Sequence, residues 1–213
     1  RHDHIVRLAD EIDNYFDKLV AAESKDNGKP EHLARSVDIP RASENFRFFA
    51  TASLHFDSEV HEMDGKALNY TLRKPVGVVG CISPWNLPLY LLTWKIAPAL
   101  AAGNTVVAKP SEITPMTAYL FSEICQKANF PKGVLNIVHG YGHKVGDALS
   151  KHPHVPIISF TGGTATGKKI ASIAAPMFKK LSLELGGKNP NIVFADAEFD
   201  NSVDMAVKAA FSN

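Results

Sequence analysis

Residues 76–82 read Val76-Gly77-Val78-Val79-Gly80-Cys81-Ile82, a short run without a charged side chain. Such a run is typical of a strand that is buried on both faces of a parallel sheet. After it, helical stretches alternate with short apolar runs: strands are expected at 105–108, 134–138, 157–160 and 180–184, and helices at 89–101, 117–128, 144–151 and 168–177. Strict alternation with short connections predicts an α/β fold with a doubly wound parallel sheet.

The residues on either side of this region have a different character. Apolar residues at three- and four-residue steps predict an amphipathic helix over 4–26 and a second helical stretch over 31–56, kinked after Pro40. A turn at 63–66 precedes a solvated antiparallel strand at 68–73. From Gly187 onward a new unit begins, with residues 191–194 and then a helix at 202–211.

Composition excludes several classes of function. The chain has 213 residues and a net charge of +1, which gives no electrostatic reason to bind nucleic acid or an anionic membrane. No run approaches the roughly 18 apolar residues of a membrane span. The two cysteines, Cys81 and Cys125, lack the spacing of metal ligands or a disulfide framework. We therefore expect no metal and a reducing, cytoplasmic location, although the chain starts at Arg1 without an initiator Met, so targeting cannot be read.

A carboxylate with unusual neighbours lies in the run Leu183-Glu184-Leu185-Gly186-Gly187-Lys188-Asn189-Pro190. Two leucines flank Glu184, which predicts that it is desolvated and that its pKa rises toward the range of a general base. The glycines that follow allow a tight bend and a close approach by another group. A buried structural glutamate at a strand end is the alternative interpretation.

Three upstream segments join this run in a recognisable order: residues 82–88 (Ile-Ser-Pro-Trp-Asn-Leu-Pro), 102–112 and 160–167. Together the four segments resemble the signatures of the aldehyde dehydrogenase superfamily, and the resemblance covers essentially the whole chain. It implies NAD-dependent oxidation of an aldehyde to the acid through a cysteine thiohemiacetal and thioester. It also implies that Asn86 stabilises the oxyanion and that Glu184 activates water.

The resemblance places the nucleophilic cysteine outside the chain. Phe211-Ser212-Asn213 resembles the start of the family's cysteine pattern, which puts the thiol about five residues further on. Cys81 and Cys125 fit better as small core residues. The chain as given is therefore expected to be inactive.

Two glycine-containing loops are candidates for the dinucleotide site. Residues 140–146 carry Gly-x-Gly-x-x-x-Gly, one residue too long for the dinucleotide fingerprint, so a simple turn is the alternative. Residues 161–167 place free N–H groups at a helix N-terminus that favours phosphate. The family pattern has Ser where this chain has Gly163.

Lys109 and Glu112 follow a strand end, where open α/β sheets hold their ligands. Glu112 can accept hydrogen bonds from both ribose hydroxyls and would repel the 2′-phosphate of NADP, so NAD is expected, although a solvated ion pair with Lys109 is the alternative. The expected cofactor-binding residues are Ile82, Ser83, Pro84, Trp85, Lys109, Ser111, Glu112, Gly142, Gly146, Phe160, Gly162, Gly163, Thr164, Gly167 and Leu185.

The substrate prediction rests on three further segments, 23–29, 39–50 and 89–95, which resemble the muconic-semialdehyde dehydrogenases. The substrates of those enzymes carry a carboxylate distant from the aldehyde. Arg41 lies on a helix that lines the substrate tunnel in this family, and a guanidinium binds a carboxylate in bidentate fashion. A surface arginine in an ion pair with a neighbour is the alternative.

The resemblance also divides the chain. It implies an N-terminal helical part of the NAD-binding domain (1–63), an oligomerisation arm (64–76), a Rossmann-like core (77–186) and the start of a catalytic domain (187–213). The expected partners are a small aldehyde and further copies of the protein, in a dimer or tetramer. Two other functions stay open: a catalytically silent structural relative of the crystallin kind, and an acylating enzyme that uses CoA, against which Glu184 argues.

Overall fold

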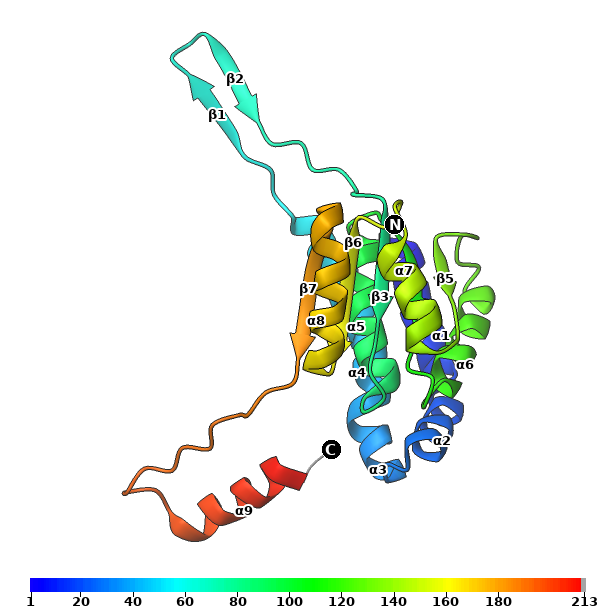
Figure 1. Cartoon of the computed structure of the whole chain (residues 1–213), viewed down its shortest axis with the longest axis vertical. Helices are drawn as coiled ribbons and strands as arrows, with labels where there is room; N and C mark the ends of the chain where they lie inside the picture. Colours follow the sequence, from blue (N-terminus) through cyan, green and yellow to red (C-terminus); the bar gives the residue numbers. More distant parts are fainter. Residues whose placement is uncertain (212–213) are drawn as a thin grey trace.

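The computed structural model describes residues 1–211 and is an α/β structure built on a five-stranded parallel sheet (Figure 1). The strands follow the order β5-β4-β3-β6-β7. Their bounds are β3 Val78–Ile82, β4 Thr105–Lys109, β5 Leu135–Ile137, β6 Ile157–Gly162 and β7 Lys180–Leu185. The chain runs outward from β3 to β5 and then returns to place β6 on the other side of β3. This reversal confirms the doubly wound prediction and creates a switch point between β3 and β6.

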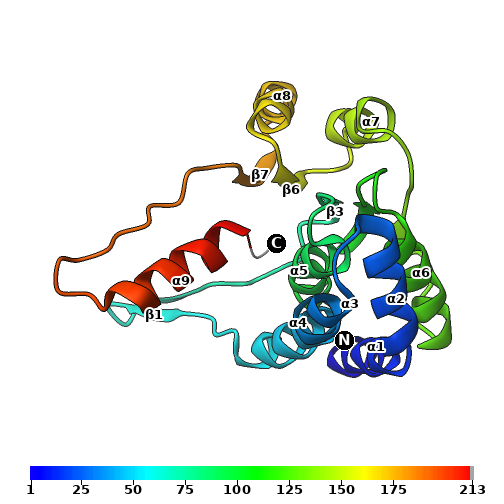
Figure 2. The ribbon, with the colours of Figure 1, turned by 90° about the horizontal axis from the view of Figure 1, so that it is seen from below.

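Helices cover both faces of the sheet (Figure 2). On one face lie α7 (Asp147–Lys151) and α8 (Thr164–Ala174), over a small core formed by Ile82, Leu149, Val155, Ile158, Phe160 and Ile170. On the other face α5 (Pro88–Ala101) and α6 (Met116–Lys127) cover the sheet, and α1 (His2–Asn14) and α4 (Ile39–Ala52) pack on these two helices, so that the four helices enclose the larger core. Helices therefore bury β3 from both sides.

Gly80 explains how closely the central strands and helices pack. It lies in the middle of β3, and a Cβ there would be 2.7 Å from Cδ1 of Ile158 and 3.1 Å from Cγ of Leu149. Both contacts are shorter than ordinary van der Waals distances, so neighbouring side chains from β6 and α7 occupy the space above this residue.

The N-terminal helices differ from the prediction in two places. The helix expected over 4–26 is interrupted at Tyr15, so that α1 is followed by a separate α2 (Phe16–Asn27). The break lets α1 pack mainly on α4 while α2 packs on α6. In the second stretch, α3 (Glu31–Leu33) continues as a π-helical segment, η1 (Ala34–Asp38), before α4 begins. The irregularity thus precedes Pro40, because a proline removes the N–H that would bond one turn back and crowds that turn.

The antiparallel element is a hairpin rather than a single strand. After a 3₁₀ turn η2 (Ser53–His55), β1 (Val60–Met63) pairs with β2 (Ala67–Tyr70), and the predicted turn between them contains Asp64 and Gly65 at positive φ. Every residue of both strands is exposed, and the hairpin projects away from the sheet (Figure 1). The strand β1 is not predicted, because no apolar alternation marks residues 60–63.

Several of the remaining elements differ from the prediction in their bounds or type. A π-helical turn η3 (Gly142–Gly146) precedes α7, and a 3₁₀ turn η4 (Ala175–Met177) follows α8. Residues 191–194 have no regular structure, and α9 (Phe199–Phe211) starts three residues before the predicted 202. This helix lies apart from the sheet and buries none of its side chains (Figures 1 and 2). The predicted cysteine-pattern start at 211–213 lies partly outside the described residues.

Among residues 1–211, none of the helices combines the length and the apolar character that a transmembrane span requires.

Candidate functional site

Most of the predicted site residues lie at or just beyond the carboxyl ends of four parallel strands, β3, β4, β6 and β7. Ile82 closes β3, and its register partners are Lys109 at the end of β4 and Phe160 in β6. Across the next pair, Thr161 lies opposite Glu184 in β7. Since parallel strands end at the same edge, segments separated by about 100 residues of sequence meet here. The structure therefore brings the four motifs together at one edge of the sheet.

The loop after β3 carries Asn86, and several groups hold it. The N–H of Ser83 donates to the carbonyl of Lys109 at 3.2 Å, and the Thr114 hydroxyl donates to the carbonyl of Trp85 at 3.4 Å. Lys29 donates to the carbonyl of Asn86 at 3.3 Å. Asn86 itself is half-buried, and within residues 1–211 its side-chain amide has no hydrogen-bond partner. Its amide is thus left able to donate to a bound molecule.

Lys109 and Glu112 form the predicted pair. The Lys109 ammonium is buried and donates to Oε2 of Glu112 at 2.6 Å, while the N–H of Gly142 donates to Oε1 at 3.1 Å. Burial raises the pKa of Glu112, but these hydrogen bonds and its own backbone N–H outweigh burial and lower the pKa to about 2. The carboxylate is therefore charged at neutral pH, and it joins the loop after β4 to the glycine-containing turn at 142–146.

The second glycine-containing loop leads into α8. Gly163 is the N-cap of this helix, and no side chain caps the first N–H groups. A Cβ at Gly163 would meet no atom within 4 Å. The serine that the family pattern has at this position would therefore fit without a clash. One turn further, a Cβ at Gly167 would lie 2.5 Å from Cδ2 of Leu185. These glycines keep the helix N-terminus open and bring α8 close to β7.

Glu184 does not have the burial that its flanking leucines predict. Glu184 is exposed, Leu183 is half-buried, and 40% of the surface of Leu185 is accessible to solvent. The prediction was wrong for this chain because β7 is an edge strand. It pairs only with β6, and no described element covers its other side.

Lys95 is a residue that the sequence analysis missed. It lies on the buried face of α5 with 5% of its area exposed, and its ammonium donates to the Ser159 hydroxyl at 3.3 Å. Burial lowers the pKa of Lys95, while Cys81 and Glu184 act in the opposite direction. The signal was available, because Lys95 occupies a helical position whose neighbours Leu92 and Ile96 are apolar core residues.

Three buried ionisable groups lie behind the Asn86 loop. The Lys29 ammonium and the Asp38 carboxylate are 2.6 Å apart, with 6% and 1% of their side-chain areas exposed. Glu23 is fully buried nearby, and neither carboxyl oxygen has a hydrogen-bond partner of good geometry among the described residues. Burial, and then the charge of Asp38, raise the pKa of Glu23 to about 7, although Thr117 and Lys29 act in the opposite direction.

Arg41 lies near the start of α4 and is half-exposed. Its guanidinium is 3.2 Å from the carboxylate of Glu44 and 5.8 Å from the ring centroid of Tyr90, which is in the first turn of α5. Arg47 lies on another face and pairs with Asp10 at 2.6 Å and Asp13 at 2.8 Å. Arg41 is therefore the arginine of α4 that faces the first turn of α5, although its pairing with Glu44 also fits the surface alternative.

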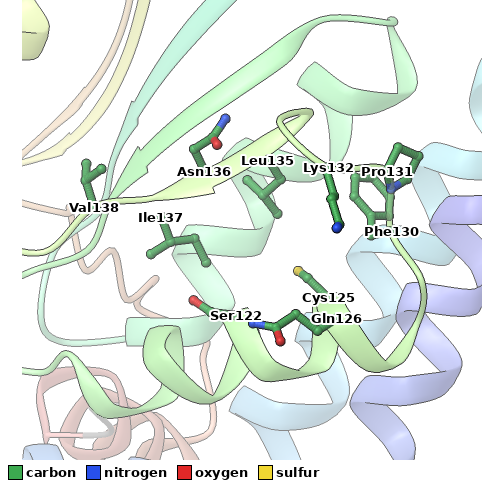
Figure 3. Close-up of a pocket in the computed structure, with 10 residues that line it drawn as sticks. All are labelled: Ser122, Cys125, Gln126, Phe130, Pro131, Lys132, Leu135, Asn136, Ile137 and Val138. Atoms are coloured by element: carbon green, nitrogen blue, oxygen red, sulfur yellow. The ribbon is translucent and has the colours of Figure 1, made fainter.

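The two cysteines are poor nucleophiles. Burial raises the pKa of each thiol, in Cys81 and in Cys125, to about 12. Cys125 lines a pocket of about 420 Å³ beside α6 and β5 that contains none of the predicted site residues (Figure 3). In the part of the chain that the structure describes, no group of three or more His, Cys, Asp or Glu side chains could hold a metal ion.

Comparison with known proteins identifies the class. The profile of the aldehyde dehydrogenase family matches residues 1–213, and the chain therefore belongs to the aldehyde dehydrogenase family. It is 58% identical over 208 residues to the 2-aminomuconic semialdehyde dehydrogenase of Danio rerio, covering 97% of this chain and 43% of that protein. It is 50% identical over 212 residues to the 2-hydroxymuconic semialdehyde dehydrogenase of Pseudomonas sp. (strain CF600), covering 97% and 44%.

A solved structure agrees with this assignment. The NAD+ complex structure of the aldehyde dehydrogenase from Bacillus cereus has a TM-score of 0.95 and 40% sequence identity, covering 98% of this chain and 42% of that one. The chain thus spans less than half the length of the relatives it matches.

The raised pKa of Glu23 predicts a pH dependence of stability. The unfolded chain releases this proton near pH 4.5, whereas the folded chain keeps it until about pH 7. The free energy of unfolding should therefore decrease as pH rises through this window, and the contribution of Glu23 to this decrease is about 3 kcal/mol. In Glu23→Gln this contribution disappears, and urea denaturation at several pH values measures the difference between the two curves.

The matched control is Glu123→Gln, which removes an exposed carboxylate paired with Lys18. Its curve should run parallel to that of the unchanged chain. If Glu23→Gln also left the pH dependence unchanged, Glu23 would be ionised in the folded state at all pH values above its ordinary pKa.

Proposed function

We propose that the protein oxidises an aldehyde to the carboxylic acid with NAD, and that this chain supplies the cofactor site and two catalytic groups. The observation that carries the proposal is the meeting of Asn86, the Lys109–Glu112 pair, the open N-terminus of α8 and Glu184 at one edge of the sheet. Membership of the aldehyde dehydrogenase family supports it.

The cofactor residues fit NAD by their chemistry. The Glu112 carboxylate, charged and held by Lys109, can accept hydrogen bonds from ribose hydroxyls and would repel an added 2′-phosphate. The uncapped N–H groups of α8 favour a pyrophosphate, and the open space around Gly163 leaves room for one. Bound NAD would accept the hydride that leaves the substrate carbon.

The reaction requires a thiol that Cys81 and Cys125 do not provide, since Cys81 is buried, Cys125 is half-buried, and desolvation raises the pKa of each thiol to about 12. We place it beyond Asn213, following the resemblance of 211–213 to the cysteine pattern. The thiolate sulfur adds to the aldehyde carbon, and the Asn86 amide donates to the oxyanion that forms. Once the adduct has become a thioester, Glu184 takes a proton from water, whose oxygen attacks the thioester carbon and releases the acid and the thiolate, and the proton passes from Glu184 to solvent.

The substrate proposed is a semialdehyde that carries a remote carboxylate. Relatives at 58% and 50% identity are named for 2-aminomuconic and 2-hydroxymuconic semialdehydes. The Arg41 guanidinium lies over the ring of Tyr90, which is in the first turn of the helix that follows the Asn86 loop. Its partner Glu44 is exposed and could exchange for the substrate carboxylate.

The wider setting is proposed from the resemblance. We propose that the domains divide at 63/64, 76/77 and 186/187 and that the protein forms a homo-oligomer through the exposed hairpin. We also propose a cytoplasmic location and a role in tryptophan catabolism. A catalytically silent relative is the second candidate. It would need neither the free amide of Asn86 nor a carboxylate at 184, and the chain has both.

Replacing Glu184 by Gln in a protein of full family length that carries this chain tests the role of the base. The first turnover should form NADH at nearly the normal rate, because acylation does not use this group. Steady-state turnover should fall by at least about tenfold, since deacylation does. Stopped-flow absorbance measures both phases, and an unchanged steady-state rate at neutral pH would assign the base to another residue.

Replacing Glu112 by Gln tests cofactor choice. NAD should bind about tenfold more weakly, while NADP gains from the loss of charge repulsion, so the preference for NAD narrows. Binding titrations with both cofactors measure the ratio. Glu123→Gln, a surface change of the same kind, should leave the ratio unaltered. An unchanged ratio in Glu112→Gln would mean that Glu112 faces solvent when the cofactor is bound.

Replacing Arg41 by Ala tests the substrate. The value of kcat/KM for a muconic semialdehyde should fall by an amount equivalent to roughly 2 to 4 kcal/mol, while a neutral aldehyde of similar length should be little affected. Arg47→Ala is the matched control, because Arg47 pairs with Asp10 and Asp13 instead. An equal loss on charged and neutral aldehydes would show that Arg41 supports the fold, and the substrate would revert to an unspecified aldehyde.

A further inference from the structure

A buried ion pair lies directly behind the loop that carries Asn86. Lys29 and Asp38 are each almost completely buried, and their charged atoms are 2.6 Å apart. Removing two charges from water is costly, and such a pair adds little net stability compared with apolar side chains of the same size. Its presence therefore calls for a role other than holding the fold together.

The chain around Lys29 directs this side chain inward. Gly28 adopts a left-handed conformation with φ of 77° and ends α2. Both backbone groups of Lys29 are then bound locally: its N–H donates to Oδ1 of Asn27 at 2.8 Å, and its carbonyl accepts from the Ser24 hydroxyl at 2.5 Å. These bonds fix the backbone of Lys29, and the ion pair with Asp38 holds the buried end of its side chain.

The ammonium of Lys29 joins this ion pair to the reaction loop. It donates to Asp38 and also to the main-chain carbonyl of Asn86, at 3.3 Å. Among the described residues Lys29 is the one hydrogen-bond donor to that carbonyl, and the Asn86 side chain has no partner of its own. Asp38 is in turn anchored at the junction between η1 and α4. The orientation of the Asn86 peptide thus depends on a charge held in the helical layer.

We propose that Lys29 is a positioning residue for the reaction: held by Asp38, it fixes the peptide of Asn86 so that the Asn86 amide faces the oxyanion that forms on the substrate. This inference rests on the proposed role of Asn86. A donor stabilises a transition state best when it needs no reorganisation as charge develops. The groups that orient such a donor are therefore part of the catalytic arrangement although they do not touch the substrate.

The test uses the full-length protein with both charges of the pair removed together. Lys29→Met with Asp38→Asn keeps the volume of both side chains and leaves no unpaired buried charge. The first-turnover rate of NADH formation should fall by about tenfold or more, while the dissociation constant of NAD stays within about twofold. Lys18→Met with Glu123→Gln removes an exposed pair and should change neither quantity.

A double-mutant cycle separates positioning from general support of the fold. In the Asn86→Ala background, the loss caused by Lys29→Met/Asp38→Asn should shrink to about twofold or less, because the amide that Lys29 orients is gone. An equal loss in both backgrounds would overturn the inference. If Asn86→Ala itself left the first-turnover rate unchanged, the proposed role of Asn86 would fail, and the inference with it. If Asn86→Ala lowered the first-turnover rate but Lys29→Met/Asp38→Asn did not, the inference about Lys29 would be overturned while the proposed role of Asn86 would stand.

A second variant serves if the Lys29 substitution prevents folding. Replacing Leu87 by its α-hydroxy acid converts the Asn86 carbonyl to an ester carbonyl, a weaker acceptor, and leaves the buried pair intact. The first-turnover rate should fall by about threefold or more with unchanged NAD binding. A first-turnover rate equal to that of the unmodified protein would overturn the inference.

Discussion

The parallel pairing of β3 on both of its edges is the constraint on which the site depends. In this register Ile82 lies between Lys109 on one side and Phe160 on the other, so β3 and β4 end at the same level and β6 ends two residues later. The close approach of Ile158 over Gly80 shows how little room the central strands leave for a different register. A shift by one residue would turn the apolar residues out of both cores and separate the loops that form the site.

Buried lysines form a second constraint around these loops. Lys29, Lys95 and Lys109 are each at most 8% exposed, and each is directed at a different part of the edge. Lys109 holds Glu112, Lys95 lies near Glu184, and Lys29 contacts the peptide of Asn86. Buried charges of this kind cost stability, so an arrangement of three behind one site trades stability for fixed electrostatics. The unpaired carboxyl of Glu23 beside this layer adds to that cost.

Much of the fold could be predicted from the sequence because buried parallel strands and their helices leave strong local patterns. The apolar run at 76–82 and the alternation after it predict the sheet, and strand-end motifs predict which loops meet. Family resemblance alone supplies roles for Asn86, Glu112 and Arg41, since a side-chain type cannot tell a carboxylate that binds ribose from one in a surface ion pair. Those roles remain proposals.

Local residue patterns by themselves determined the strand and helix types, the glycine-containing loops and the absence of a suitable nucleophile among the two cysteines. Tertiary structure decided the rest, because burial and contact depend on partners distant in the chain. The break at Tyr15 follows from packing on two different helices, and Glu184 is exposed because β7 is an edge strand. Nothing within residues 24–38 indicates that Lys29 would meet the carbonyl of Asn86. That contact exists only because α2, η1 and the loop after β3 pack together.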